Sequence, residues 1–130
     1  MTPAPGGNAN HDLLVAHIAA WSRHDLDAIM EMMTQDCVYE SSGGEDPWGR
    51  RYTGAAQVRE AYADLFELLP DIRFQNARHV AAGDRGVSEW TLLATRPDGT
   101  RIEARGCDLF EFRGGKIHRR DSYRKRRIAR

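Results

Sequence analysis

The fold is decided by residues 101–123, which read RIEARGCDLFEFRGGKIHRRDSY. The first half of this stretch alternates with a period of two, which places apolar and charged side chains on opposite faces of a strand. The apolar parity consists of Ile102, Ala104, Gly106, Asp108, Phe110 and Phe112. Gly114 and Gly115 then turn the chain, so residues 116–123 are predicted to return as the second strand of a hairpin.

Asp108 is the single ionisable group in the middle of this apolar parity. A carboxyl group among apolar neighbours is desolvated, which raises its pKa and favours the neutral, proton-donating form. The sequence therefore predicts that Asp108 is the centre of any chemistry.

Charge is unevenly distributed along a chain whose formal net charge is zero. Residues 1–70 carry 11 acidic and four basic side chains, whereas residues 71–130 carry eight acidic and 15 basic ones. We predict one domain over residues 11–125, between a disordered leader at 1–10 and a basic tail at 126–130. The basic run is interpreted as a solvated tail, or as a match for the acidic half of the same or a partner subunit.

Neither a metal nor a cofactor is expected. Cys37 and Cys107 lie in apolar stretches without the spacing of a metal site, and are interpreted as small buried hydrophobes in a reducing compartment. No glycine-rich phosphate loop follows a strand, and the histidines are not clustered. The N-terminus lacks a signal pattern and no apolar run is long enough to cross a membrane, which predicts a cytoplasmic protein.

Helical periodicity dominates the first 70 residues. We predict helices over residues 11–23, 26–33 and 54–69, with a short strand over 36–40 and a glycine-rich loop over 41–53. Leu14 and Trp21 lie on the core stripe of the first helix, with His17 between them. The loop carries Trp48 and Tyr52, and such large apolar side chains rarely lie on a loop without covering something.

After Pro70, which should end the third helix, the pattern changes from helix to strand. We predict strands over residues 72–82, 86–95, 101–113 and 116–123, with Asp98-Gly99 as a hairpin turn. Because the apolar helix stripes need a partner, the three N-terminal helices should pack on one face of a strongly curved, mainly antiparallel sheet. The predicted class is an α+β cone that encloses a pocket, with Asp108 on its wall.

Five short motifs occur in an informative order: WSRHDLDAI at 21–29, DCVYE at 36–40, Gly54, DLFEF at 108–112 and GKI at 115–117. Their order and spacing resemble the nuclear-transport-factor-2-like (NTF2-like) superfamily, particularly its SnoaL-like polyketide cyclase and ketosteroid isomerase branches. The resemblance covers nearly the whole chain after the leader and implies the cone fold. Because this superfamily hosts isomerases, dehydratases, cyclases, epoxide hydrolases and binding proteins, the fold alone does not fix the function.

The resemblance to ketosteroid isomerases implies roles for four positions. An acid at the position of Asp108 stays protonated there and donates to the developing enolate oxygen. The partner donor is a tyrosine in those enzymes; its place is taken here by His17, which can donate or accept near neutral pH. The general base falls at Ser41, which cannot serve as a base of that kind. Glu40, beside it, is the candidate if a register shift turns it inward.

The last predicted strand resembles the corresponding strand of two other groups in this superfamily. Limonene epoxide hydrolases and SnoaL-like cyclases carry an acid there, in a stretch that resembles residues 120–123 (RDSY), and Asp121 is the match. A gapless register points Ser122 into the cavity and Asp121 outward. Glu89 and Thr91 fall near the positions of the hydrolase's Arg-x-Asp pair, so an epoxide hydrolase is not predicted.

The leading hypothesis is a cofactor-independent enzyme that isomerises, cyclises or dehydrates a small hydrophobic carbonyl compound. A base, Glu40 or His17, would remove a proton α to the carbonyl, and Asp108 would stabilise the oxyanion. Asp121 is the reserve acid. The residues expected to bind the substrate are Trp21, Tyr39, Trp48, Tyr52, Phe66, Trp90, Phe110, Arg120 and Ser122.

The alternative is a non-catalytic ligand-binding or assembly module that uses the same cavity. In that case Arg119, Arg120 and Arg124 would bind an anionic ligand. The basic tail lacks interleaved aromatic residues, so nucleic acid is not expected as a partner. A membrane is not expected either, because no apolar run is long enough to span one. Cys107 and Leu109 interrupt the charged face of their strand, and the resemblance implies a homodimer through that side of the sheet.

Overall fold

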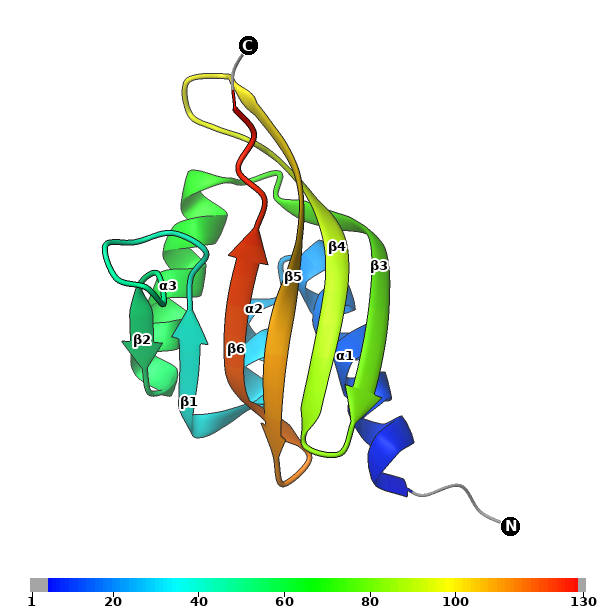
Figure 1. Cartoon of the computed structure of the whole chain (residues 1–130). Helices are drawn as coiled ribbons and strands as arrows, with labels where there is room; N and C mark the ends of the chain where they lie inside the picture. Colours follow the sequence, from blue (N-terminus) through cyan, green and yellow to red (C-terminus); the bar gives the residue numbers. More distant parts are fainter. Residues whose placement is uncertain (1–4, 129–130) are drawn as a thin grey trace.

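The computed structural model describes residues 5–128 (Figure 1). Its elements, in chain order, are α1 (Pro5–Ser22), α2 (Leu26–Glu31), β1 (Met33–Glu40), β2 (Arg51–Thr53), α3 (Ala55–Leu68), β3 (Arg73–Ala82), β4 (Arg85–Thr95), β5 (Arg101–Arg113) and β6 (Lys116–Arg124). Within these residues the strands form one sheet in the order β2-β1-β6-β5-β4-β3. β1 and β6 run parallel, and every other neighbouring pair is antiparallel.

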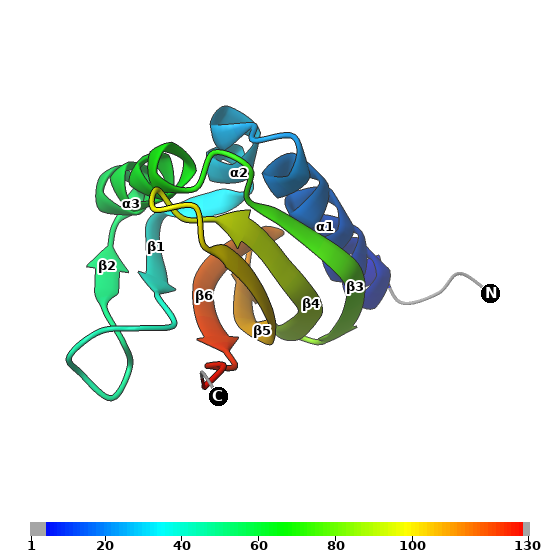
Figure 2. The ribbon, with the colours of Figure 1, turned by 90° about the horizontal axis from the view of Figure 1, so that it is seen from above.

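The sheet is curved, and the helices lie on one side of it (Figures 1 and 2). The ladders β1–β6, β3–β4 and β5–β6 each contain a register shift. In β3 the shift includes Asn76, whose φ is 55°. Because such bulges bend a strand and increase its twist, they allow the sheet to curl around the helices. The side that faces the helices is called the inner face below, and the opposite side the outer face.

Local sequence signals explain where the helices begin and end. The side chain of Asp25 caps α2 by accepting a hydrogen bond from the backbone N–H of Ala28 at 3.1 Å. Gly54 precedes α3 with a φ of 88°, a conformation that favours glycine. α3 ends at Leu68, shortly before Pro70, which cannot continue a helix.

Several sequence predictions agree with this fold. The α+β class, the curved sheet and the β5–β6 hairpin are present. Burial along β5 follows the predicted alternation, because Ile102, Ala104, Asp108, Phe110 and Phe112 are all buried.

Other sequence predictions need correction. Within residues 5–128 only α1 and α2 precede the sheet, since α3 is inserted between β2 and β3. β2 lies within the segment predicted to be a loop, and β1 begins at Met33. α1 begins at Pro5, inside the leader predicted to be disordered, whose residues 1–4 lie outside the described part of the chain. Cys37 is buried as expected, whereas Cys107 is partly exposed on the outer face.

The core has two parts. One joins α1, α3 and the sheet around Trp21, Tyr62 and Phe110. The other fills the end of the sheet around Trp90 and Ile102. Among the described residues, no helix is both long and apolar enough to span a membrane.

Candidate functional site

Asp108 lies on the inner face of β5 and is 1% exposed. The β4–β5–β6 register places Ser88 and Ser122 on either side of it. Trp90 donates a hydrogen bond from Nε1 to Oδ2 of Asp108 at 3.0 Å, and the Ser122 hydroxyl donates to Oδ1. Asp108 is therefore surrounded by polar donors, which differs from the apolar environment that the sequence predicted.

Arg120 is the third partner of Asp108. Its Nε lies 3.3 Å from Oδ2 of Asp108, and the residue is only 3% exposed. Its guanidinium carbon lies over three aromatic rings, 4.7 Å from the centroid of Trp21, 5.2 Å from that of Tyr39 and 5.4 Å from that of Tyr62. Such ring faces attract a cation.

The charge of Arg120 is retained despite its burial. Burial acts to lower the pKa of Arg120, but the negative charge of Asp108 and the neighbouring tyrosines raise it above the ordinary value. Among residues 5–128, neither Nε nor Nη1 of Arg120 has a hydrogen-bond partner. Nε lies near Oδ2 of Asp108 but is not aligned for a hydrogen bond with it. The site therefore holds a buried cation, two of whose nitrogen atoms donate no hydrogen bond within residues 5–128.

Arg120 is one of the residues that line a cavity of about 360 Å³. Its lining combines apolar side chains of the α3 end and the sheet with polar groups of β1 and β6. The lining residues are Tyr39, Ser41, Ser42, Leu65, Leu68, Leu69, Ile72, Phe74, Trp90, Leu92, Arg96, Pro97, Ile102, Arg120, Ser122 and Arg124. We call it the inner cavity. Its mostly apolar walls and few convergent polar groups are typical of a small-molecule site.

His17 belongs to the core and does not line the inner cavity. It is 1% exposed, and its Nε2 accepts a hydrogen bond from Nε1 of Trp21 at 3.1 Å. Burial, followed by the positive charges of Arg120 and His79, holds the pKa of His17 well below its ordinary value. His17 is therefore a neutral histidine that supports Trp21, rather than a group that faces a ligand.

Glu40 and Asp121 lie on the outer face, away from Asp108. β1 places Tyr39 inward beside Arg120, so the next residue, Glu40, points outward beside Asp121. The Glu40 carboxylate is fully buried there between Arg51 and Arg119. Asp121 lies 4.0 Å from Arg119, and its pKa is raised, chiefly by burial. The structure does not bring these two carboxylates together with Asp108.

The predicted substrate-binding residues fall into two groups. Tyr39, Trp90, Arg120 and Ser122 line the inner cavity. The others do not: Trp21 and Phe110 are core residues, Phe66 packs against Trp21, Tyr52 stacks on Tyr39, and Trp48 lies beneath the guanidinium of Arg51.

Sequence reasoning missed most of the apolar wall of the inner cavity and the pairing of Arg120 with Asp108. Ile72 and Leu92, for example, line the inner cavity, although only their place in predicted strands was recognised. Arg120 was expected to bind substrate but not to pair with Asp108. The available signal was its parity with Ser122, which puts both side chains on one face of β6.

In residues 5–128, no group of three or more His, Cys, Asp or Glu side chains is arranged to hold a metal ion.

The comparisons with known proteins give a family and a fold. A family model described as a SnoaL-like domain matches residues 14–120. No curated protein matches the chain. Several solved structures are similar, each under 25% identical, and they show the fold alone.

One of these structures is a candidate polyketide cyclase from Xanthomonas campestris pv. campestris, with 19% identity, 91% of each chain covered and a TM-score of 0.81. TerC, co-crystallised with polyporic acid, has 24% identity over 90% of this chain and 92% of its own, with a TM-score of 0.77. An NTF2-like protein from Mesorhizobium loti has 23% identity over 96% of this chain and 98% of its own, with a TM-score of 0.78.

Proposed function

This chain belongs to the SnoaL-like domain family, and from that premise we propose that it binds a small, largely apolar carbonyl compound and performs cofactor-independent acid–base chemistry on it. The reaction class is isomerisation, cyclisation or dehydration, through proton transfer next to the carbonyl. One observation carries the proposal: within residues 5–128 the buried Nη1 of Arg120 has no hydrogen-bond partner, and Arg120 lines an apolar cavity.

Arg120 supplies the electrophile in this proposal. A carbonyl oxygen that contacts the Arg120 guanidinium from the cavity would be polarised, and the negative charge that develops on proton removal would be stabilised there. This interaction is stronger in a buried site than in water. The aromatic rings and Asp108 already hold the guanidinium in place, so little reorganisation accompanies the reaction.

Proton transfer is assigned to Ser122 and Asp108. Asp108 itself does not line the inner cavity, but Ser122 does, and its hydroxyl donates to Asp108. Ser122 therefore provides the route by which a proton passes between a bound compound and the carboxylate. Ser122 and Asp108 are proposed instead of Glu40 and His17, the bases expected from the sequence, because neither Glu40 nor His17 lines the cavity.

The alternative is a non-catalytic binding module of the same fold. The observation in its favour is that the Asp108 carboxylate already has three partners, Trp90, Ser122 and Arg120, so both of its oxygens are already engaged within the protein. In this case Arg120 would fix the orientation of a ligand without activating it.

Solvent deuterium exchange separates the two functions. 2-Tetralone, an apolar ketone with acidic α-protons, is incubated with the protein in D2O, and loss of the α-proton signal is followed by NMR. We expect the protein to accelerate exchange, and Arg120→Met to reduce the acceleration by about 100-fold or more, the scale of a lost oxyanion donor. Quenching of tryptophan fluorescence reports binding separately, because Trp90 lines the cavity.

The controls are a conservative variant and a folding check. Arg120→Lys keeps a cation and should retain part of the acceleration, provided that circular dichroism shows both variants folded. Binding without accelerated exchange in the wild type would favour the non-catalytic module. Exchange that is unchanged in folded Arg120→Met would overturn the role of Arg120.

A further inference from the structure

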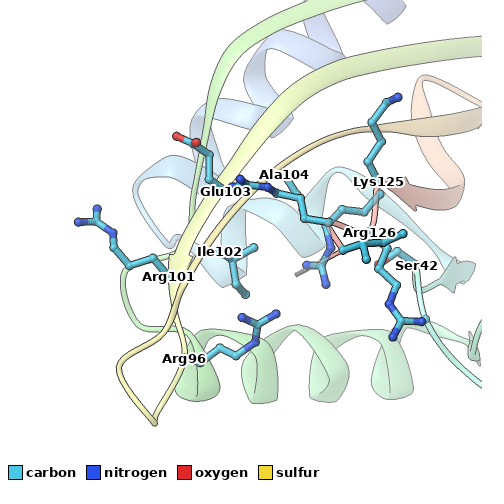
Figure 3. Close-up of a pocket in the computed structure, with 12 residues that line it drawn as sticks. Ser42, Arg96, Arg101, Ile102, Glu103, Ala104, Lys125 and Arg126 are labelled. Carbon is cyan, nitrogen blue, oxygen red and sulfur yellow. The ribbon is translucent and has the colours of Figure 1, made fainter. Parts of the chain in front are cut away.

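A second cavity, of about 660 Å³, adjoins the inner cavity on the side of the C-terminal segment (Figure 3). The two cavities share Ser42, Arg96, Ile102 and Arg124 as lining residues. The additional lining comes from Gly43, Arg101, Glu103, Ala104, Lys125, Arg126, Arg127 and Ile128. The two cavities therefore meet at these four residues.

Half of the residues that line this second cavity are cationic. We call Arg96, Arg124, Lys125, Arg126 and Arg127 the basic mouth. Within the described residues none of these five side chains has a salt-bridge partner, since the carboxylates that form ion pairs do so with other residues.

Within residues 5–128 the nearby acids form no ion pair with the side chains of the basic mouth. Asp98, in the turn beside Arg96, accepts hydrogen bonds from the backbone and hydroxyl of Thr100. Figure 3 shows the carboxylate of Glu103 turned away from Arg96 and Arg126. The pKa of Arg124 is lowered, first by burial and then by the like charge of Arg96. Cations gathered without a counter-ion favour the binding of an anion.

The position of the basic mouth is fixed by the sheet. The backbone N–H of Lys125 donates to the carbonyl of Arg105 at 2.8 Å, which holds the start of the C-terminal segment against β5. Arg120 and Arg124 lie four residues apart in β6 and, by alternation, on the same face, roughly 13 Å apart along an extended strand. The distance along β6 between Arg120, the proposed carbonyl-binding group, and Arg124 in the basic mouth is thus similar to the length of a small molecule.

We infer that the basic mouth binds the anionic group of the substrate, so that the substrate class is an amphipathic keto acid or phosphorylated ketone. This inference rests on the proposed function, because the carbonyl end is placed at Arg120. The apolar body occupies the inner cavity, and the carboxylate or phosphate lies among Arg96, Arg124 and the following arginines. A small molecule, rather than a nucleic acid, is the occupant because the cations continue into an apolar cavity.

A matched pair of ligands tests the inference. 8-Oxo-8-phenyloctanoic acid carries a ketone at one end and a carboxylate at the other, and its methyl ester lacks the charge. Calorimetry should show at least about tenfold tighter binding of the acid than of the ester at low salt. The ratio should shrink as salt is raised, because exposed charges are screened.

The double variant Arg96→Gln/Arg124→Gln should bring the acid-to-ester ratio close to one. Arg78→Gln, which removes an exposed arginine from β3, should leave the ratio unchanged. Equal binding of acid and ester by the wild type would overturn the anion site but leave the proposed function standing. A ratio that survives in the double variant would also overturn it. If the ester and 2-tetralone both fail to bind, the proposed function itself fails.

Discussion

The guanidinium of Arg120 pairs with the carboxylate of Asp108 inside the protein, with 3.3 Å between Nε and Oδ2 and side-chain exposures of 4% and 1%. Removing one charge from a buried pair leaves the other uncompensated, which typically costs about 3–5 kcal/mol. We therefore expect Asp108→Asn to lower the free energy of unfolding by about 3 kcal/mol in urea denaturation. Asp36→Asn, which breaks an exposed pair with Arg113, is the control and should have no measurable effect. Equal effects of the two substitutions would contradict the buried pair.

Glu40→Gln separates a structural role from a catalytic one. Glu40 is fully buried, but its partners Arg51 and Arg119 are 44% and 37% exposed, so its loss should cost less than that of a completely buried pair. We expect the free energy of unfolding to fall by about 2 kcal/mol, while the deuterium exchange of 2-tetralone stays unchanged.

Glu111→Gln is the matched control for Glu40, because it removes a weaker, 39% exposed contact to the same arginine. It should change stability less than Glu40→Gln. If Glu40→Gln abolished the exchange in a folded protein, Glu40 would be the base that the sequence first suggested.

The alternation of β5 was sufficient to predict which side of the strand is buried, and with it the inward position of Asp108. A gapless register of the last strand likewise predicted that Ser122 points inward and Asp121 outward, in agreement with the structure. Both predictions depend on period-two alternation, which is a local property of the chain.

The partners of these residues could not be predicted in the same way. Glu40 pairs with Arg119, which is 79 residues away, across a parallel ladder that contains a register shift. The bulge between Glu111 and Phe112 similarly sets which residue of β6 meets Asp108. A one-residue slip reverses the faces of a strand, so pairings across a bulge need the three-dimensional register.

His17 should make stability depend on pH. Its pKa is held well below the ordinary value, first by burial and then by the charges of Arg120 and His79. Below about pH 6.5 the unfolded chain binds a proton that the folded chain does not, so this contribution to stability is present above pH 6.5 and is lost as the pH falls. Below pH 6.5 this slope can reach at most about 1.4 kcal/mol per pH unit, the limit for one proton.

His17→Gln keeps an acceptor for Trp21 and should remove that part of the slope, as measured by urea denaturation at several pH values. His79→Gln is the comparison, because His79 is less buried and its pKa is lowered by burial and by His11. A slope in His17→Gln equal to that of the wild type would show that His17 takes up a proton equally in both states.

A homodimer through the outer face remains a prediction. Val80, Val87 and Leu109 lie side by side on this face in the β3–β4–β5 register, and Val80 and Leu109 are 66% and 40% exposed. An apolar row on an exposed sheet face is suited to a second copy. We expect sedimentation equilibrium to show a dimer that Leu109→Glu converts to a monomer. Val15→Glu, which changes a 44% exposed residue of α1, should leave the dimer intact, and a monomeric wild type would refute the prediction.

Gly106 is required by the packing around the site. A Cβ atom at this position would lie 2.3 Å from the carbonyl oxygen of Tyr123 and 2.7 Å from the ring of Trp90, which donates to Asp108. Gly106→Ala must therefore displace the β6 backbone or the indole, and overpacking of this kind typically costs about 1–3 kcal/mol. Gly43→Ala is the control, since a Cβ there meets no atom within 4 Å. Urea denaturation should show a loss of unfolding free energy for Gly106→Ala and none for Gly43→Ala. The Trp90 indole N–H resonance should also shift in Gly106→Ala, because its hydrogen bond to Asp108 is disturbed. Unchanged stability and an unchanged resonance would contradict the predicted strain.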